Sequence, residues 1–168
     1  MKKMTTQALD TAFAGESMAH MKYLVFSAIA EKEGKPNIAR MFKAISYAEQ
    51  VHATNHARNL GYIGDTAANL VAAKGGEDFE ITEMYPVYNA TAKLQDEKGA
   101  ELSTHYALEA EKIHSKMYGR AQECVKAGKD IEIGTVYICP VCGHTCEDEA
   151  PGVCPICQCK GEKFIAFT

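Results

Sequence analysis

The sequence predicts a mainly α-helical protein, a four-helix bundle followed by a small C-terminal metal domain built from short β-strands. Apolar residues recur at helical spacing along most of residues 1–134, and all seven cysteines lie at or after Cys124. From Val136 onward the sequence is rich in cysteine, proline and glycine. We therefore expect a helical domain with its linker over residues 1–134 and a cysteine-rich domain over residues 135–168.

Four helices are expected in the first domain, over residues 5–33, 36–60, 77–97 and 100–127. Pro36 suits the first position of the second helix, where a missing N–H costs nothing. Residues 65–76 are expected to form a connection that ends in two glycines. Pro86 is expected to kink the third helix, because proline removes one backbone hydrogen bond. Residues 128–135 are expected to form the linker.

Charge and hydropathy exclude several classes of function. The net charge is −4, with 18 basic and 22 acidic residues, so nothing favours nucleic-acid binding. The first residues contain no apolar stretch typical of a signal peptide, and no run of 18 apolar residues occurs, so we expect a cytoplasmic protein without a membrane span. In a reducing compartment, clustered cysteines favour metal binding over disulfides.

Carboxylates and histidines recur on helix faces that a bundle should bury. Residues three apart share one face of a helix, so a Glu-x-x-His pair presents two ligands in one direction. The seven residues are Glu16 in the first helix, Glu49 and His52 in the second, Glu77 and Glu80 at the start of the third, and Glu111 and His114 in the fourth.

Burying several carboxylates together is costly unless cations neutralise them, and mixed oxygen and imidazole ligands suit iron or manganese, with zinc possible. One Glu-x-x-His pair alone is common, and Glu77 with Glu80 alone would suit an acidic first turn of a helix. The joint pattern favours a di-metal site in the bundle. Tyr23 is a candidate hydrogen-bond partner of Glu16, although a core tyrosine fits its spacing equally well. His20 is a less favoured rival ligand.

Two Cys-x-x-Cys turns lie eleven residues apart and can surround one metal ion tetrahedrally. Their spacing does not choose between iron and zinc, and a structural zinc site remains an alternative. The four predicted ligands are Cys139, Cys142, Cys154 and Cys157. The other three cysteines, Cys124, Cys146 and Cys159, are expected to be free thiols.

Several motifs together resemble the rubrerythrin family over essentially the whole chain. They are AFAGES at 12–17, EQVH at 49–52, GEDFE at 76–80, TEMYP at 82–86, AEKIH at 110–114, and the CPVCG and CPIC pairs, in the family's order. The resemblance implies a ferritin-like di-iron bundle, a rubredoxin-like iron domain, and reduction of hydrogen peroxide to water in defence against oxidative stress. One departure is Gln158, where rubredoxins often have glycine.

The resemblance also implies roles for the ligands. Glu16 would be a terminal ligand of one iron, and Glu49 and Glu111 would bridge both irons. Glu77 and His114 would complete the coordination of the second iron. Glu80 and His52 would alternate as ligands of the first iron as its redox state changes.

An NAD(P)H-dependent reductase or small electron carrier would supply electrons through the four-cysteine iron. The sequence has no G-x-G-x-x-G motif of its own. A homodimer or higher oligomer is expected, with the four-cysteine iron of one subunit near the di-iron site of another. The alternative functions are a ferroxidase or iron-storage protein, and a metal-stabilised structural or redox-sensing protein.

Overall fold

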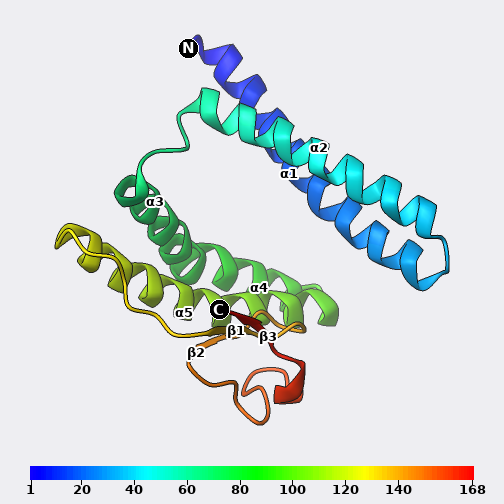
Figure 1. The fold of residues 1–168 in the computed structure, drawn as a ribbon, viewed down its shortest axis with the longest axis vertical. Coiled ribbons are helices and arrows are strands. Elements are labelled where there is room, and N and C mark those ends of the chain that lie inside the picture. Colours follow the sequence, from blue (N-terminus) through cyan, green and yellow to red (C-terminus); the bar gives the residue numbers. More distant parts are fainter. The chain divides into compact units, whose positions relative to one another are not determined.

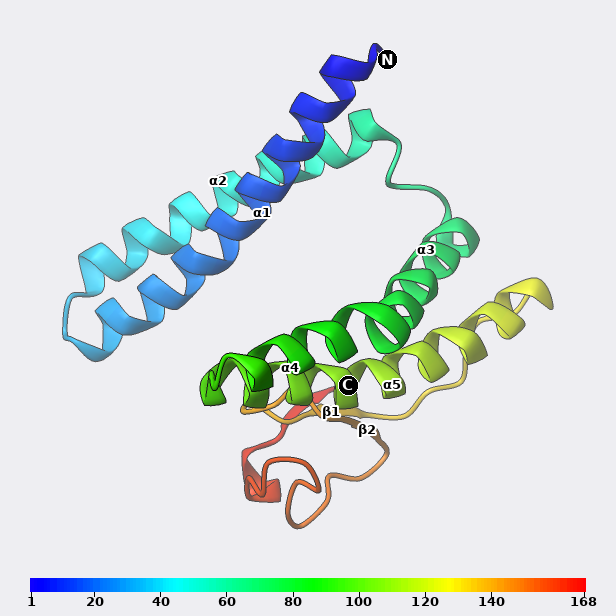
Figure 2. The ribbon, with the colours of Figure 1, turned by 180° about the vertical axis from the view of Figure 1, so that it is seen from behind.

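The computed structural model describes residues 1–168 as two units, Met1–Gly64 and Asp65–Thr168. The first unit is a hairpin of two long helices, α1 (Lys3–Lys32) and α2 (Pro36–Leu60), which run antiparallel side by side (Figures 1 and 2). Both helices were expected within a few residues of these bounds. No helix of the chain is both long and apolar enough to cross a membrane.

The α1–α2 hairpin is closed by a short turn and held by contacts between its helices. Gly34 in this turn has φ +69°, a backbone conformation that glycine adopts without steric cost. Pro36 occupies the first position of α2, as its missing N–H predicts. The rings of Phe26 and Phe42 meet edge to face with centroids 5.5 Å apart, so aromatic packing joins the two helices near this turn.

The second unit begins with a helical run of three parts, α3 (Thr66–Phe79), the π-helical turn η1 (Glu80–Met84) and α4 (Tyr85–Leu94). This run packs along α5 (Lys98–Lys126). The π-helical turn ends two residues before Pro86, and the amide of Tyr85 donates to the carbonyl of Glu80 across the wider turn. The distortion expected at Pro86 is therefore a π-helical turn at the junction of η1 and α4.

The expected connection over residues 65–76 is wrong, because α3 already begins at Thr66. Asp65 caps the helix, its Oδ1 accepting from the amide of Ala68 at 2.8 Å. The two glycines that suggested a loop end cost about 1 kcal/mol each inside a helix, and packing along α5 offsets that cost. Glu77 consequently lies well inside a helix, and the acidic first turn considered for this segment is wrong as well.

The cysteine-rich segment forms a three-stranded antiparallel sheet in the order β2-β1-β3, with strands β1 (Val136–Ile138), β2 (Thr145–Glu147) and β3 (Ile165–Phe167). A short 3-10 helix, η2 (Gly161–Lys163), precedes β3. Strand β2 contacts α5, and Arg120 of α5 pairs with Glu147. The predicted helical class with a β-rich cysteine module is confirmed. The predicted domain boundary at residue 134 stays a prediction.

Candidate metal centres

The α1–α2 hairpin brings three of the predicted ligands together. Ligand atoms of Glu16, Glu49 and His52 all lie within 4.8 Å of one another. The Nδ1 atom of His52 lies 3.2 Å from Glu49 Oε2 and 3.8 Å from Glu16 Oε1. A hydrogen bond from Glu16 to Glu49 raises the pKa of Glu16, and the same bond lowers the pKa of Glu49. The two carboxyl groups thus influence each other's pKa, and a cation bound between them would relieve their mutual repulsion.

A buried serine sets the pairing of α1 with α2 beside this cluster. Ser46 is fully buried, and its hydroxyl donates to the carbonyl of His20 at 2.9 Å. The Nδ1 atom of His20 in turn lies 2.9 Å from the Ser46 carbonyl and 3.0 Å from the Ser46 hydroxyl. His20 is therefore occupied by hydrogen bonds between the helices and is absent from the ligand cluster.

The second unit brings another three predicted ligands together, across α3 and α5. Ligand atoms of Glu77, Glu111 and His114 lie within 4.8 Å of one another. The Nδ1 atom of His114 lies 2.6 Å from Glu111 Oε2 and 4.0 Å from Glu77 Oε1. Burial raises the pKa of Glu77, and repulsion by the Glu111 carboxylate adds to the effect. Burial also raises the pKa of Glu80, with Glu77 as the second cause.

A polar contact between the residues that directly follow Glu77 and His114 fixes the register of α3 against α5. The hydroxyl of Ser115 donates to Asp78 Oδ1 at 2.6 Å, and the Lys74 ammonium lies 2.6 Å from Asp78 Oδ2. Lys74 and then Ser115 lower the pKa of Asp78, which stays ionised. Asp78 follows Glu77 and Ser115 follows His114, so this contact places the two ligands opposite each other. The sequence pattern did not single out this supporting pair.

Two tyrosines bear on the helical clusters. Tyr23 packs its ring at 6.1 Å from both Phe26 and Phe42 and makes no hydrogen bond to Glu16, so its proposed role beside a ligand stays a prediction. Tyr85 was not singled out by spacing, yet it lies beside the acid cluster. Burial and then the carboxylates of Glu80, Glu111 and Glu77 raise its pKa. The TEMYP motif contained this signal, but its meaning depended on where η1 turned the chain.

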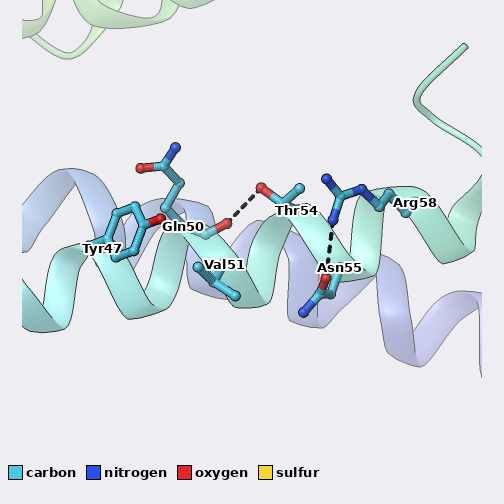
Figure 3. Close-up of a pocket in the computed structure, with 6 residues that line it drawn as sticks. All are labelled: Tyr47, Gln50, Val51, Thr54, Asn55 and Arg58. Carbon is cyan, nitrogen blue, oxygen red and sulfur yellow. Dashed lines mark hydrogen bonds between the residues drawn. The ribbon is translucent and has the colours of Figure 1, made fainter.

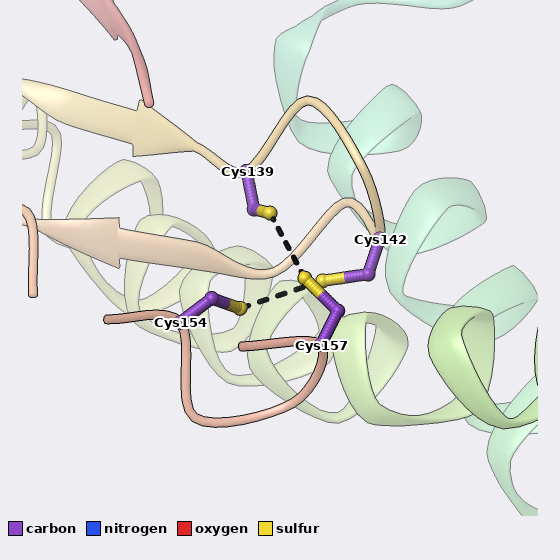
Figure 4. Close-up of side chains that lie close together, drawn as sticks. All are labelled: Cys139, Cys142, Cys154 and Cys157. Atoms are coloured by element: carbon purple, nitrogen blue, oxygen red, sulfur yellow. Dashed lines mark hydrogen bonds between the residues drawn. The ribbon is translucent and has the colours of Figure 1, made fainter. Parts of the chain in front are cut away.

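The four predicted cysteine ligands converge as expected (Figure 4). The Sγ atoms of Cys139 and Cys157 are 3.5 Å apart, those of Cys142 and Cys154 are 3.6 Å apart, and all four lie within 4.8 Å of one another. Metal–sulfur bonds of about 2.3 Å in a tetrahedron place sulfur atoms roughly 3.8 Å apart. The thiols therefore fit one tetrahedral metal ion.

The two Cys-x-x-Cys turns have the same backbone geometry. The amide of Gly143 donates to the Cys139 carbonyl, and the amide of Gln158 donates to the Cys154 carbonyl, both at 3.0 Å. Both residues have positive φ, +77° and +62°. Burial raises the pKa of the Cys139 thiol, but the backbone N–H groups of Val141 and Cys142 and the Cys157 thiol outweigh it and lower that pKa to about 7.

The three remaining cysteines are free and lie outside this cluster, as expected: Cys124, Cys146 and Cys159. A shallow hollow on α2 is also separate from the metal ligands (Figure 3). Its lining contains no acid, histidine or cysteine, and within it Arg58 donates to Asn55 Oδ1 at 3.4 Å. With one helix as its only wall, this hollow offers no site for a metal.

The carboxylate–histidine clusters on the helices of the two units, together with the four-cysteine module on a small sheet, are typical of a class of non-haem iron proteins. Residues 7–122 match the family model of rubrerythrin, and residues 137–165 match that of the rubrerythrin rubredoxin-like domain. The chain belongs to the rubrerythrin family. Its cofactors are those of the family, a di-iron centre held by Glu and His residues and one iron held by four cysteines.

Individual relatives match almost from end to end. Rubrerythrin-2 of Clostridium acetobutylicum is 51% identical over 178 aligned positions, which cover 98% of this chain and 97% of that protein. Nigerythrin of Nitratidesulfovibrio vulgaris is 32% identical, over 97% of this chain and 86% of that protein. The structure of nigerythrin in its fully reduced, all-ferrous state has a TM-score of 0.57 at 28% identity, with 97% of this chain and 86% of that chain covered.

Proposed function

We propose that this protein is a non-haem di-iron peroxidase that reduces hydrogen peroxide to water in a reducing compartment. Electrons would come from an NAD(P)H-dependent reductase or a small electron carrier and pass through the four-cysteine iron. The supporting observation is that one compact unit contains both kinds of metal ligand, with strand β2 of the cysteine module packed on the helix of Glu111 and His114. A storage protein has no need of that arrangement.

We propose seven residues as iron ligands on the family's ligand pattern, in which two Glu-x-x-His pairs combine with further glutamates. Each unit of the chain supplies three of them as a preformed cluster, and Glu80 lies beside Glu77. The proposed ligands are Glu16, Glu49, His52, Glu77, Glu80, Glu111 and His114. Cys139, Cys142, Cys154 and Cys157 hold the third iron.

When bound, the metals would supply Lewis-acid and redox chemistry, two electrons at the paired irons and one at a time from the four-cysteine iron. The protein's own groups complete the reaction, in which peroxide takes up two electrons and two protons to give two waters. Tyr85 keeps its proton because burial and the neighbouring carboxylates raise its pKa, so its phenol can donate a hydrogen bond to an oxygen species in the site. The ionised Asp78 with Lys74 keeps α3 in register.

The test uses full-length protein that is purified without oxygen and loaded with iron. Metal analysis should first show about three ions per chain, two in the bundle site and one in the cysteine site. We expect rapid oxidation of the reduced protein by peroxide and sustained peroxide consumption when a reductase supplies electrons. A ferroxidase would instead oxidise and accumulate added Fe²⁺ with oxygen and show no donor-linked turnover. A second preparation carries zinc instead of iron in the cysteine site. If this preparation keeps the donor-linked turnover of the iron form, the relay through the four-cysteine iron is refuted.

A further inference from the structure

Thr145 is a buried polar residue at the point where the cysteine module meets α5. It begins strand β2, and only 3% of its surface is exposed. Its Oγ1 lies 2.8 Å from Nε2 of His114, a proposed iron ligand, and 3.0 Å from the carbonyl oxygen of Gly143. Gly143 directly follows Cys142, a ligand of the other metal site. A single hydroxyl therefore contacts both metal-binding regions.

The hydrogen-bond directions follow from counting protons. A threonine hydroxyl has one proton, and the Gly143 carbonyl can only accept, so Thr145 donates to Gly143. Thr145 must then accept from Nε2 of His114, which carries the ring proton. With a proton on Nε2, Nδ1 is the ring nitrogen that faces the Glu111 carboxylate, and it lies 2.6 Å from that carboxylate oxygen.

We propose that Thr145 is a positioning residue that fixes His114 in the Nε2–H tautomer, so that Nδ1 is presented to the metal beside Glu111 and Glu77. The inference rests on the proposed function for the ligand role of His114, and it goes beyond it. The outer partner of a bundle ligand comes from the cysteine module, so metal binding at one site supports metal binding at the other. Such coupling is reciprocal, because each site stabilises the geometry that the other requires.

The contact also makes a short route of bonds between the two sites within one chain. From the His114 ring it crosses one hydrogen bond to Thr145 and a second to the Gly143 carbonyl, and it continues through the backbone to Cys142. The C-terminal module is further anchored to α5 by Arg120 with Glu147 and by Tyr106, which packs against the buried cysteines. These contacts between the cysteine module and α5 keep Thr145 next to His114.

The test compares full-length Thr145→Val, which keeps the shape but loses the hydroxyl, with Thr145→Ser, which keeps the hydroxyl. Thr91→Val is the matched control, since the Thr91 hydroxyl bonds a carbonyl of its own helix, that of Val87. The first readout is the tautomer of His114, measured by long-range proton–nitrogen-15 correlation NMR on zinc-loaded protein. The His114 signals are assigned as those that are missing from the spectrum of His114→Gln. The second readout is Co²⁺ affinity of the bundle, with and without zinc in the cysteine site.

We expect the Nε2–H tautomer in wild type, Thr145→Ser and Thr91→Val, and its loss or a mixture in Thr145→Val. Co²⁺ affinity of the bundle should fall about 10-fold or more in Thr145→Val, since outer partners of metal-bound histidines typically contribute 10- to 100-fold. Zinc in the cysteine site should raise that affinity in wild type and have no effect in Thr145→Val.

An unchanged tautomer and unchanged Co²⁺ affinity in Thr145→Val would overturn the inference. The same losses in Thr145→Ser would also overturn it, because shape rather than the hydroxyl would then be responsible. Neither readout depends on turnover, so a protein that shows the tautomer effect but consumes no peroxide would refute the proposed function and leave the role of Thr145 intact.

Discussion

Gly161→Ala should dismantle the four-cysteine site while leaving the helices intact. A β-carbon at Gly161 would overlap the carbonyl oxygen of Pro151. It would also lie 2.9 Å from the carbonyl carbon of Pro151 and 3.1 Å from the carbonyl carbon of Gly152. These neighbours are backbone atoms, so no flexible side chain can move aside. The two chain segments that flank the second pair of cysteines would have to separate.

The expected cost follows from what that separation breaks. Overpacking costs about 1–3 kcal/mol, and loss of the hydrogen bond from the Gly161 amide to the Gly152 carbonyl, 2.9 Å long, adds about 1 kcal/mol. A module of this size depends on its metal to fold, so a cost of about 2–4 kcal/mol should appear as a roughly 30- to 700-fold loss of metal affinity.

The assay is competition between the protein and a chelator for zinc, repeated for iron with the visible iron–thiolate absorption as the signal. Gly152→Ala is the matched control, since a β-carbon there would meet no atom within 4 Å, and we expect it within about threefold of wild type. If Gly161→Ala also binds metal within about threefold of wild type, the reasoning from backbone contact fails. If it loses metal but keeps full reductase-coupled turnover, the electron relay fails instead.

Three further predictions concern the same sites. Glu49→Ala should lose the bundle metals and peroxide turnover but keep the four-cysteine absorption, as metal analysis would show; retention of both irons would contradict the ligand assignment. Burial raises the folded pKa of Glu77 and Glu80 above the unfolded value of about 4.3, so the folded metal-free protein binds more protons than the unfolded chain above that pH. Stability of the metal-free protein should therefore fall as the pH rises above about 4.3, whereas metal-loaded protein should show the opposite slope. A melting temperature of the metal-free protein that does not change with pH would contradict this. Gln158 and Gly143 both have positive φ, +62° and +77°, a conformation that costs a residue with a side chain more than glycine. Gln158→Gly should therefore stabilise the metal-loaded module by less than about 1 kcal/mol in denaturant unfolding, and Gly143→Ala should destabilise it. Equal effects of the two substitutions would refute this argument from backbone strain.

Local signals in the sequence determined much of this protein. Proline at the start of α2 predicted where that helix begins, because its missing N–H suits the first helical position whatever the rest of the fold does. The two Cys-x-x-Cys turns predicted the four thiols that converge, since each turn directs two thiols the same way regardless of the rest of the fold. The Glu-x-x-His pairs likewise fixed which residues share a helix face.

Tertiary structure decided what depends on contacts between distant segments. The double glycine suggested a loop, and only the packing of α3 along α5 keeps that stretch helical and puts Glu77 opposite Glu111. Lys74, Asp78 and Ser115 set this register through side chains that no local pattern connects.

The contact between Thr145 and His114 joins residues 31 positions apart on different elements. Spacing rules describe one helix or one turn at a time, so they can name the ligands of each site. The side chain that holds a ligand from outside is decided by which elements meet, and that depends on the free energy of packing summed over the whole unit.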